Sequence, residues 1–218
     1  MNSAEPLEKP VPVSTLWLGA ATQAGFSYLS FRYPRYFWVL MTLGLSGWGV
    51  PGLRRLRRRP QTVSVRGLGL GLVLGLAGYL ITAAGAALAN RWPPGRRSLD
   101  RLQECSQSVS RPVAALLVIP AAVGEEVFWR ESVLGSQLQP EANSQLRYLL
   151  SSTLAYAAVQ AASLQPLPPV GALLLGSGAG WLRIRSGSIW PAVAAHLAYT
   201  ELCLVAPGLP GAGPGRSN

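Results

Sequence analysis

The chain has 218 residues, of which 49% are hydrophobic, and its formal net charge is +10. Arg supplies 18 of the 19 basic residues, and these lie mainly between apolar blocks, as in residues 54–59. This placement suits loops that face anionic lipid head groups and argues against a nucleic-acid partner.

The Cys and His content restricts the possible metal sites. Cys105 and Cys203 form no spaced motif, so neither a disulfide framework nor a Cys-based zinc site is supported. The chain has a single His, His196, whereas a zinc site usually needs three or four His, Cys or carboxylate ligands. We therefore expect no cofactor, and a metal ion would have to depend on carboxylates.

Seven apolar blocks predict membrane-spanning helices. Residues 67–89 contain no charge, and as a helix they would rise about 35 Å, enough to cross a hydrocarbon core of about 30 Å. The sequence therefore predicts an all-α, polytopic transmembrane bundle of about seven spans. The predicted spans are residues 14–31, 36–53, 67–89, 112–138, 147–163, 168–182 and 188–206.

Between these blocks the sequence predicts connections and tails. Residues 54–59 are expected to form a cytoplasmic loop, and residues 90–111 include a short amphipathic helix on the membrane surface. Gly67, Gly71 and Gly75 recur every four residues, which favours close approach of another helix. No cleavable signal peptide is expected. The predicted organisation is a polar tail (1–13), N-terminal membrane helices with a loop (14–109), a C-terminal core (110–206) and a disordered tail (207–218).

Two carboxylates follow directly after an apolar block. Glu125 and Glu126 come after residues 112–123, and a charge inside a membrane helix costs about 2.5–3.5 kcal/mol. On a helix Glu126 and Arg130 share a face and can form an ion pair, while Glu125 points about 100° away. The alternative interpretation is a helix end at the water interface with ordinary solvated charges.

Three further polar residues lie in apolar helices. His196 and Thr200 are one turn apart and share a face, and Gln160 lies four residues after Tyr156. A buried amide or imidazole needs hydrogen-bond partners. These residues are therefore either part of a site or structural hydrogen bonders between helices, each worth about 0.6 kcal/mol.

In these segments the chain resembles the CAAX prenyl protease 2 and bacteriocin-processing (CPBP) family of intramembrane proteases. The first family motif, two Glu followed by three residues and Arg, stands intact at residues 125–130. The second, an aromatic followed four residues later by His, reads Tyr156 and Gln160, so Gln replaces the His. The third, His followed four residues later by Asn or Asp, reads His196 and Thr200. The resemblance covers roughly residues 110–206.

The resemblance implies a mechanism in which Glu125 acts as general base on a water molecule that attacks a peptide carbonyl. Glu126 and Arg130 would support it, and His196 would stabilise the oxyanion. The replacements weaken this expectation, because Gln160 cannot carry a proton in turnover and Thr200 offers only a short hydroxyl donor. Losing an acid–base group costs about 10²- to 10⁴-fold in rate.

Three functions therefore remain open. The first is an intramembrane endopeptidase acting on a membrane-associated peptide or protein. The second is a catalytically impaired relative that binds a membrane peptide or a lipidated partner. The third is a small transporter, which the absence of internal repeats disfavours. In each case we expect a multi-pass protein in contact with the lipid bilayer, and the Arg-rich composition suggests a bacterial cytoplasmic membrane.

Overall fold

Helices form nearly all of the computed structural model. It describes residues 11–58, 61–137, 142–205 and 209, and these contain no strand, so the all-α part of the prediction is confirmed. The predicted tails, 1–13 and 207–218, lie almost wholly outside the described residues. The elements are α1 (Val13–Arg32), η1 (Pro34–Tyr36), α2 (Phe37–Gly47), α3 (Val50–Arg58), α4 (Val65–Ala89), α5 (Pro93–Ser106), α6 (Arg111–Glu126), η2 (Val127–Leu134), α7 (Ala142–Ala161), α8 (Leu167–Ser186), α9 (Trp190–Thr200) and η3 (Glu201–Val205).

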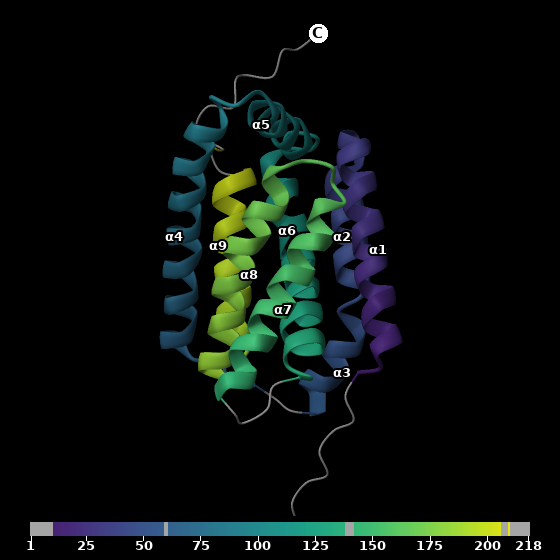
Figure 1. The fold of residues 1–218 in the computed structure, drawn as a ribbon, viewed down its shortest axis with the longest axis vertical. Helices are drawn as coiled ribbons and strands as arrows, with labels where there is room; N and C mark the ends of the chain where they lie inside the picture. Colours follow the sequence, from purple (N-terminus) through teal and green to yellow (C-terminus); the bar gives the residue numbers. More distant parts are fainter. Residues whose placement is uncertain (1–10, 59–60, 138–141, 206–208, 210–218) are drawn as a thin grey trace, which may run out of the picture.

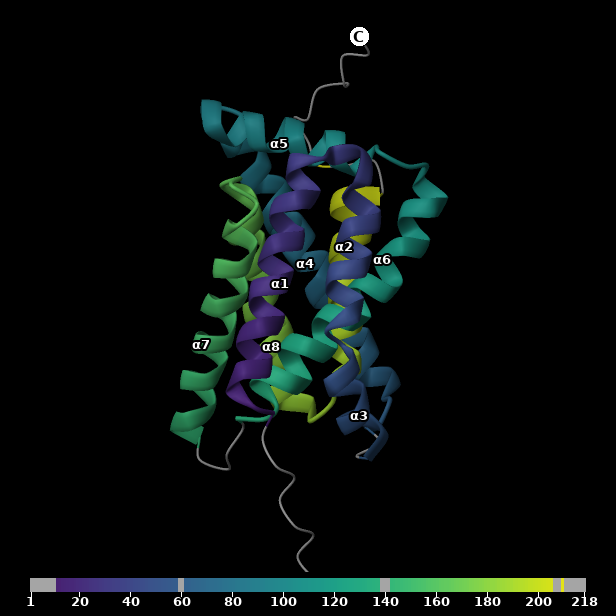
Figure 2. The same ribbon diagram turned by 90° about the vertical axis from the view of Figure 1, so that its right-hand side faces the viewer.

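The long helices run side by side along one axis, and α5 lies across one end of them (Figure 1, Figure 2). α9 packs against α4, α8 and α6, while α6 also packs against α2. α7 packs against α8 and α1. Of the helices that carry the predicted site residues, α6 and α9 therefore pack directly together, and α7 lies beside η2, which continues α6.

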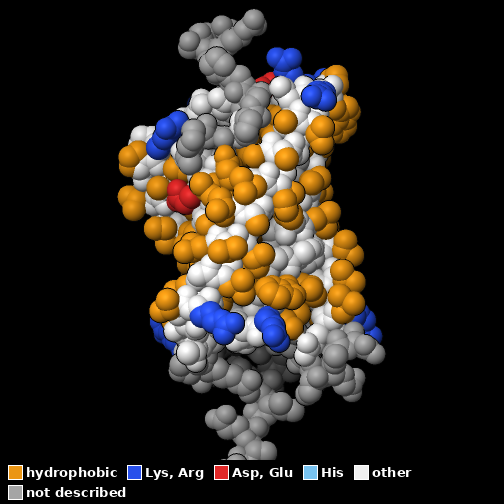
Figure 3. Space-filling model, turned by 90° about the vertical axis from the view of Figure 1, so that its left-hand side faces the viewer, with side chains coloured by type: hydrophobic (Ala, Val, Ile, Leu, Met, Phe, Trp, Pro, Cys, Tyr) orange, Lys and Arg blue, Asp and Glu red, His pale blue; other side chains and the backbone are white. Residues whose placement is uncertain are grey.

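The outer surface of the bundle is apolar over its middle. Figure 3 shows a broad band of hydrophobic side chains between Lys and Arg side chains near the two ends. On α4, Leu72, Val73 and Leu80 are each more than half exposed. Such a continuous surface is unfavourable in water and favourable in lipid. The band therefore suits a bundle embedded in a bilayer.

Two helical segments among the described residues are long and apolar enough to cross a membrane by length and composition. They are Val65–Ala89, which is α4, and Arg111–Leu134, which combines α6 and η2. The other predicted spans are helical to a large extent, but their crossing of the bilayer stays a prediction.

The prediction of a single helix over residues 36–53 is wrong, because the structure divides this segment between two helices. α2 ends at Gly47 after 11 residues, a rise of about 16 Å. α3 then continues to Arg58, so the segment predicted as a loop is helical over most of its length. At the junction a Cβ on Gly49 would lie 3.2 Å from the Gly124 Cα. Pro51 has no N–H to donate, which suits the first turn of a new helix.

The predicted close approach at the α4 glycines is confirmed, and the neighbouring helix is α9. A Cβ on Gly75 would lie 2.5 Å from the Ala195 carbonyl oxygen, and one on Gly71 would collide with the Pro191 carbonyl oxygen. Only glycine permits this backbone separation. The contact places α4 directly behind the turn of α9 that carries His196.

The helix that carries the two glutamates changes from an α-helix to a π-helix directly after them. Pro120 interrupts the hydrogen bonding inside α6. Immediately after Glu126 the backbone becomes a π-helix over Val127–Leu134, and the Gly135 N–H donates to the Arg130 carbonyl oxygen, five residues back, at 3.0 Å. π-helical segments often occur at functional sites because they redirect side chains locally.

Candidate active site

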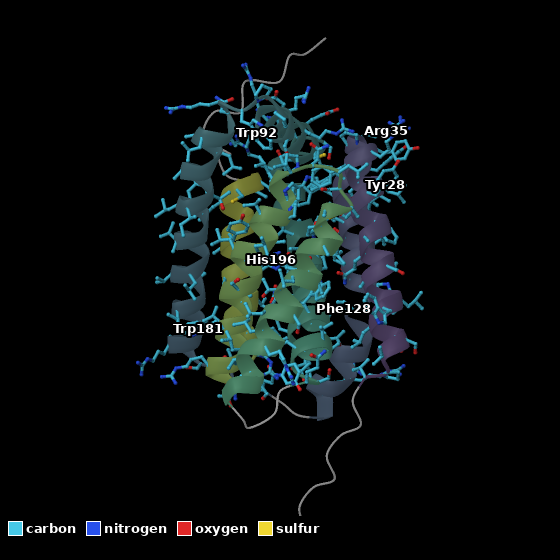
Figure 4. All side chains as sticks on the ribbon, viewed as in Figure 1. Tyr28, Arg35, Trp92, Phe128, Trp181 and His196 are labelled. Atoms are coloured by element: carbon cyan, nitrogen blue, oxygen red, sulfur yellow. The ribbon has the colours of Figure 1, made fainter. Side chains whose placement is uncertain are left out.

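The two glutamates lie inside the bundle. Glu125 is 3% exposed and Glu126 is fully buried. Figure 4 shows His196 in the interior as well, between the end that carries Trp92 and the end that carries Trp181. The alternative of a helix end with solvated charges is therefore wrong. A buried carboxylate needs a cation or hydrogen-bond donors around it, and both glutamates have them.

Glu126 joins α6 to α9 and to η2. Its Oε2 atom lies 3.0 Å from Arg130 Nε, so the predicted ion pair on one face is present. Its Oε1 atom lies 2.8 Å from Nδ1 of His196. The Arg130 guanidinium also stands over the Tyr156 ring, 5.4 Å from its centroid. The resemblance implies that Glu126 supports Glu125, and the direct partners of the Glu126 carboxylate are Arg130 and the imidazole of His196.

Glu125 points toward α7, as its offset from Glu126 on the helix predicts. The Gln160 side-chain amide donates from Nε2 to Oε1 of Glu125 at 3.2 Å. On the other side, Nε2 of His196 lies 3.6 Å from Oε2 of Glu125. The structure thus brings Glu125, Gln160 and His196 together from three helices.

Sequence reasoning missed two residues of α1 that complete this cluster. The Ser27 hydroxyl donates to Oε1 of Gln160 at 3.3 Å. The Trp129 indole N–H donates to Oε1 of Gln23 at 2.9 Å. Both α1 residues are buried. The available signal was the spacing, because Gln23 and Ser27 are polar and lie one turn apart in a moderately apolar segment.

Comparison with known protein families gives one match. Residues 107–200 match the model described as type II CAAX prenyl endopeptidase Rce1-like. Over these residues, which are fewer than half of the chain, the protein is similar to the Rce1-like family. The match contains all three motifs of the sequence analysis, and the family is a membrane-embedded family of proteases. No curated protein matches the chain. No solved structure matches it either.

A cavity of about 650 Å³ reaches the site of the Rce1-like region. Glu125, Gln160 and His196 are among its few polar lining residues. Thr200 also lines it, one turn beyond His196, and thus belongs to the cavity wall rather than to the hydrogen-bond network described above. Most of the remaining wall is apolar and comes from helices on every side, including Phe31, Trp38, Met41, Ile81, Leu99, Leu102, Leu175 and Leu204.

The Rce1-like site does not fit a metal ion. In the part of the chain that the structure describes, no group of three His, Cys, Asp or Glu side chains is arranged to hold one. Glu126 contacts Arg130 and His196 through its two oxygens, and this occupies Nδ1 of His196. Glu125 and Nε2 of His196 then supply two ligands, whereas catalytic zinc sites have three from the protein. We therefore derive the chemistry from side chains alone.

Proposed function

We propose that the protein is an intramembrane endopeptidase of the CAAX-protease type, which hydrolyses a peptide bond of a membrane-associated substrate. The observation that carries the proposal is the meeting of a buried carboxylate, Glu125, with Nε2 of His196 at the wall of an apolar cavity. A largely apolar cavity suits a lipid-modified or apolar peptide better than a polar one.

In the proposed reaction Glu125 accepts a proton from a water molecule as the water oxygen bonds to the peptide carbonyl carbon. Negative charge develops on the carbonyl oxygen, and the Nε2 side of His196 provides the nearest cationic or donor group. The C–N bond then breaks, and the proton held by Glu125 passes to the amine that leaves. Glu126 holds the imidazole through Nδ1, which keeps Nε2 toward Glu125.

The decisive test is Glu125→Gln in purified protein reconstituted in lipid, with a fluorogenic peptide that carries a prenylated cysteine. The expected result is a loss of cleavage by about 10²- to 10⁴-fold, because an amide cannot accept the proton. Glu104→Gln is the matched control, since Glu104 lies on α5 with a side chain that is 58% exposed. Cleavage that persists in Glu125→Gln would overturn the proposal.

One observation favours the second candidate, a catalytically impaired relative that binds its partner without cleaving it. Gln160 occupies the position of the family's second-motif His, and both ends of its amide are engaged, by Ser27 and by Glu125. An amide does not exchange protons in turnover. On this interpretation Gln160→His creates cleavage or raises it by about 10²-fold, the lower end of an acid–base contribution. Robust cleavage by the unaltered protein would exclude the second candidate.

We also propose that the protein crosses the bilayer seven times and resides in a bacterial cytoplasmic membrane. The crossing units are α1, α2 with α3, α4, α6 with η2, α7, α8, and α9 with η3. The apolar outer surface supports this arrangement, as do the cationic side chains near both ends of the bundle (Figure 3). The membrane-associated substrate would then reach the cavity from within the lipid phase.

A further inference from the structure

The first helix turns a polar stripe toward the site. Gln23, Ser27 and Ser30 are buried, whereas Trp17 and Leu18 of the same helix are 72% and 59% exposed. This distribution is the reverse of that of a soluble amphipathic helix, because polar groups are inside and apolar groups outside. The spacing of four and three residues places the buried polar side chains on one face. α1 precedes residues 107–200, so the family match assigns nothing to it.

Ser27 makes a directional contact with the site. Its hydroxyl lies 3.3 Å from Oε1 of Gln160, and Nε2 of the same amide lies 3.2 Å from Oε1 of Glu125. An amide oxygen only accepts and an amide nitrogen only donates, whereas an ionised carboxylate only accepts. If the amide were flipped, its oxygen would face the carboxylate oxygen without a proton between them. The Glu125 carboxylate therefore selects the orientation in which Gln160 donates to it, and the Ser27 hydroxyl, by donating to the amide oxygen, holds the other end of the amide in place.

We propose that Ser27 is a positioning residue, which holds the Gln160 amide with its NH₂ group toward the Glu125 carboxylate. The consequence for catalysis rests on the proposed function, but the hydrogen-bond chain does not. Glu125 also faces Glu126 on its own helix, Arg130 on η2, His196 on α9 and Tyr156 on α7. None of these groups fixes the orientation of the Gln160 amide, so they do not replace Ser27.

Loss of Ser27 leaves the amide held at one end only, by Glu125. The Glu125 carboxylate then has the Gln160 donor for only part of the time, and its ionised form is less favoured against its neutral form, although the Tyr156 hydroxyl remains beside it. A hydrophobic carbodiimide reports this directly, because it reacts with the protonated carboxyl group and enters the apolar interior. Labelling at Glu125, located by peptide mass spectrometry, requires no peptidase activity.

The experiment compares variants of the full chain in lipid at neutral pH. Ser27→Ala is expected to speed carbodiimide labelling of Glu125 by about three- to tenfold, the range of one hydrogen bond between neutral groups. Ser27→Thr keeps the hydroxyl and should restore the original rate. Ser30→Ala is the matched control. Ser30 lies on the same helix and is equally buried, and within the described residues its hydroxyl has no hydrogen-bond partner.

A second background separates positioning from loosened packing. In Gln160→Leu the amide is absent, so Ser27→Ala should add less than twofold to the labelling rate. An equal effect of Ser27→Ala in both backgrounds, or an equal effect of Ser30→Ala, would overturn the assignment. If labelling responds as expected but no peptide is cleaved, the proposed function fails and the positioning role stands. If cleavage occurs but labelling ignores Ser27, the positioning role fails alone.

Discussion

Arg130 is a cation buried inside the helix bundle. Its side chain is 1% exposed, and its partners are the Glu126 carboxylate and the face of Tyr156. An isolated charge at such a position would cost several kcal/mol, roughly the effective penalty for one buried ion. The ion pair, the His196 contact and the aromatic ring together make the pair of neighbouring glutamates tolerable inside an apolar bundle.

Arg130→Met tests this balance at the residue scale. It leaves the Glu126 carboxylate buried without its cation, so the expected loss of stability is about 3–5 kcal/mol. Thermal unfolding in mild detergent measures the loss. In the control, Glu104→Gln breaks the exposed pair with Arg101 and should change stability by at most about 1 kcal/mol. Equal melting of Arg130→Met and the unaltered protein would show that the ion pair contributes no stability.

At the scale of the helix, the contact between α4 and α9 fixes the position of His196. The glycines of α4 allow its backbone to lie against the carbonyl oxygens of Pro191 and Ala195. At these glycines the backbones meet directly, so the strength of the contact there comes from close van der Waals packing. Further along, the Thr82 and Tyr199 hydroxyls join the same two helices at 3.1 Å. Because Ala195 directly precedes His196, a displacement of α9 at this point moves the imidazole relative to Glu125.

Gly75→Leu tests the role of this contact. A Cβ at residue 75 would lie 2.5 Å from the Ala195 carbonyl oxygen and 2.8 Å from the Ala198 Cβ, so α9 must shift. The expected cost is about 1–3 kcal/mol of stability, together with a larger fall in any peptidase activity than in the control. That control is Gly69→Leu on the same helix, where an added Cβ meets nothing within 4 Å. Identical behaviour of the two variants would contradict the packing account.

At the scale of the whole molecule, the course of the chain predicts where the termini lie. α1 begins at one end of the bundle and η3 ends at the other (Figure 1). α5 lies across one end of the bundle (Figure 2). The proposed seven crossings, being odd in number, would therefore place the start of α1 and the end of η3 on opposite faces of the membrane.

Epitope tags at the two termini check this topology. In sealed inside-out vesicles one tag should be cleaved by added protease and the other protected, and right-side-out vesicles should give the reverse pattern. Vesicles opened with detergent serve as the control, since both tags then become accessible. Protection of both tags in the same vesicles would show an even number of crossings and would remove one of the proposed spans.

The sequence by itself determined the helical class, most helix positions, the ion pair of Glu126 with Arg130 and the close approach at the α4 glycines. Each of these follows from local spacing along one helix or from runs of apolar residues. The break at Gly49 escaped prediction because residues 36–53 are apolar enough to read as one helix. The break is needed because the backbone at Gly49 lies against Gly124, and these two residues are far apart in the sequence.

Only the tertiary structure decided which residues touch Glu125 and His196. Spacing along one helix says nothing about rotation against another helix. The Glu126 contact with His196 and the Ser27 contact with Gln160 join residues 70 and 133 positions apart. The burial of Glu125 was also decided only by the tertiary structure. Twelve apolar residues before Glu125 are equally consistent with a helix that ends in water and with a helix inside a bundle. Packing of α6 against α2 and α9, with Gln160 of α7 on the carboxylate, excludes the water interface, because neighbouring helices enclose Glu125 from several sides.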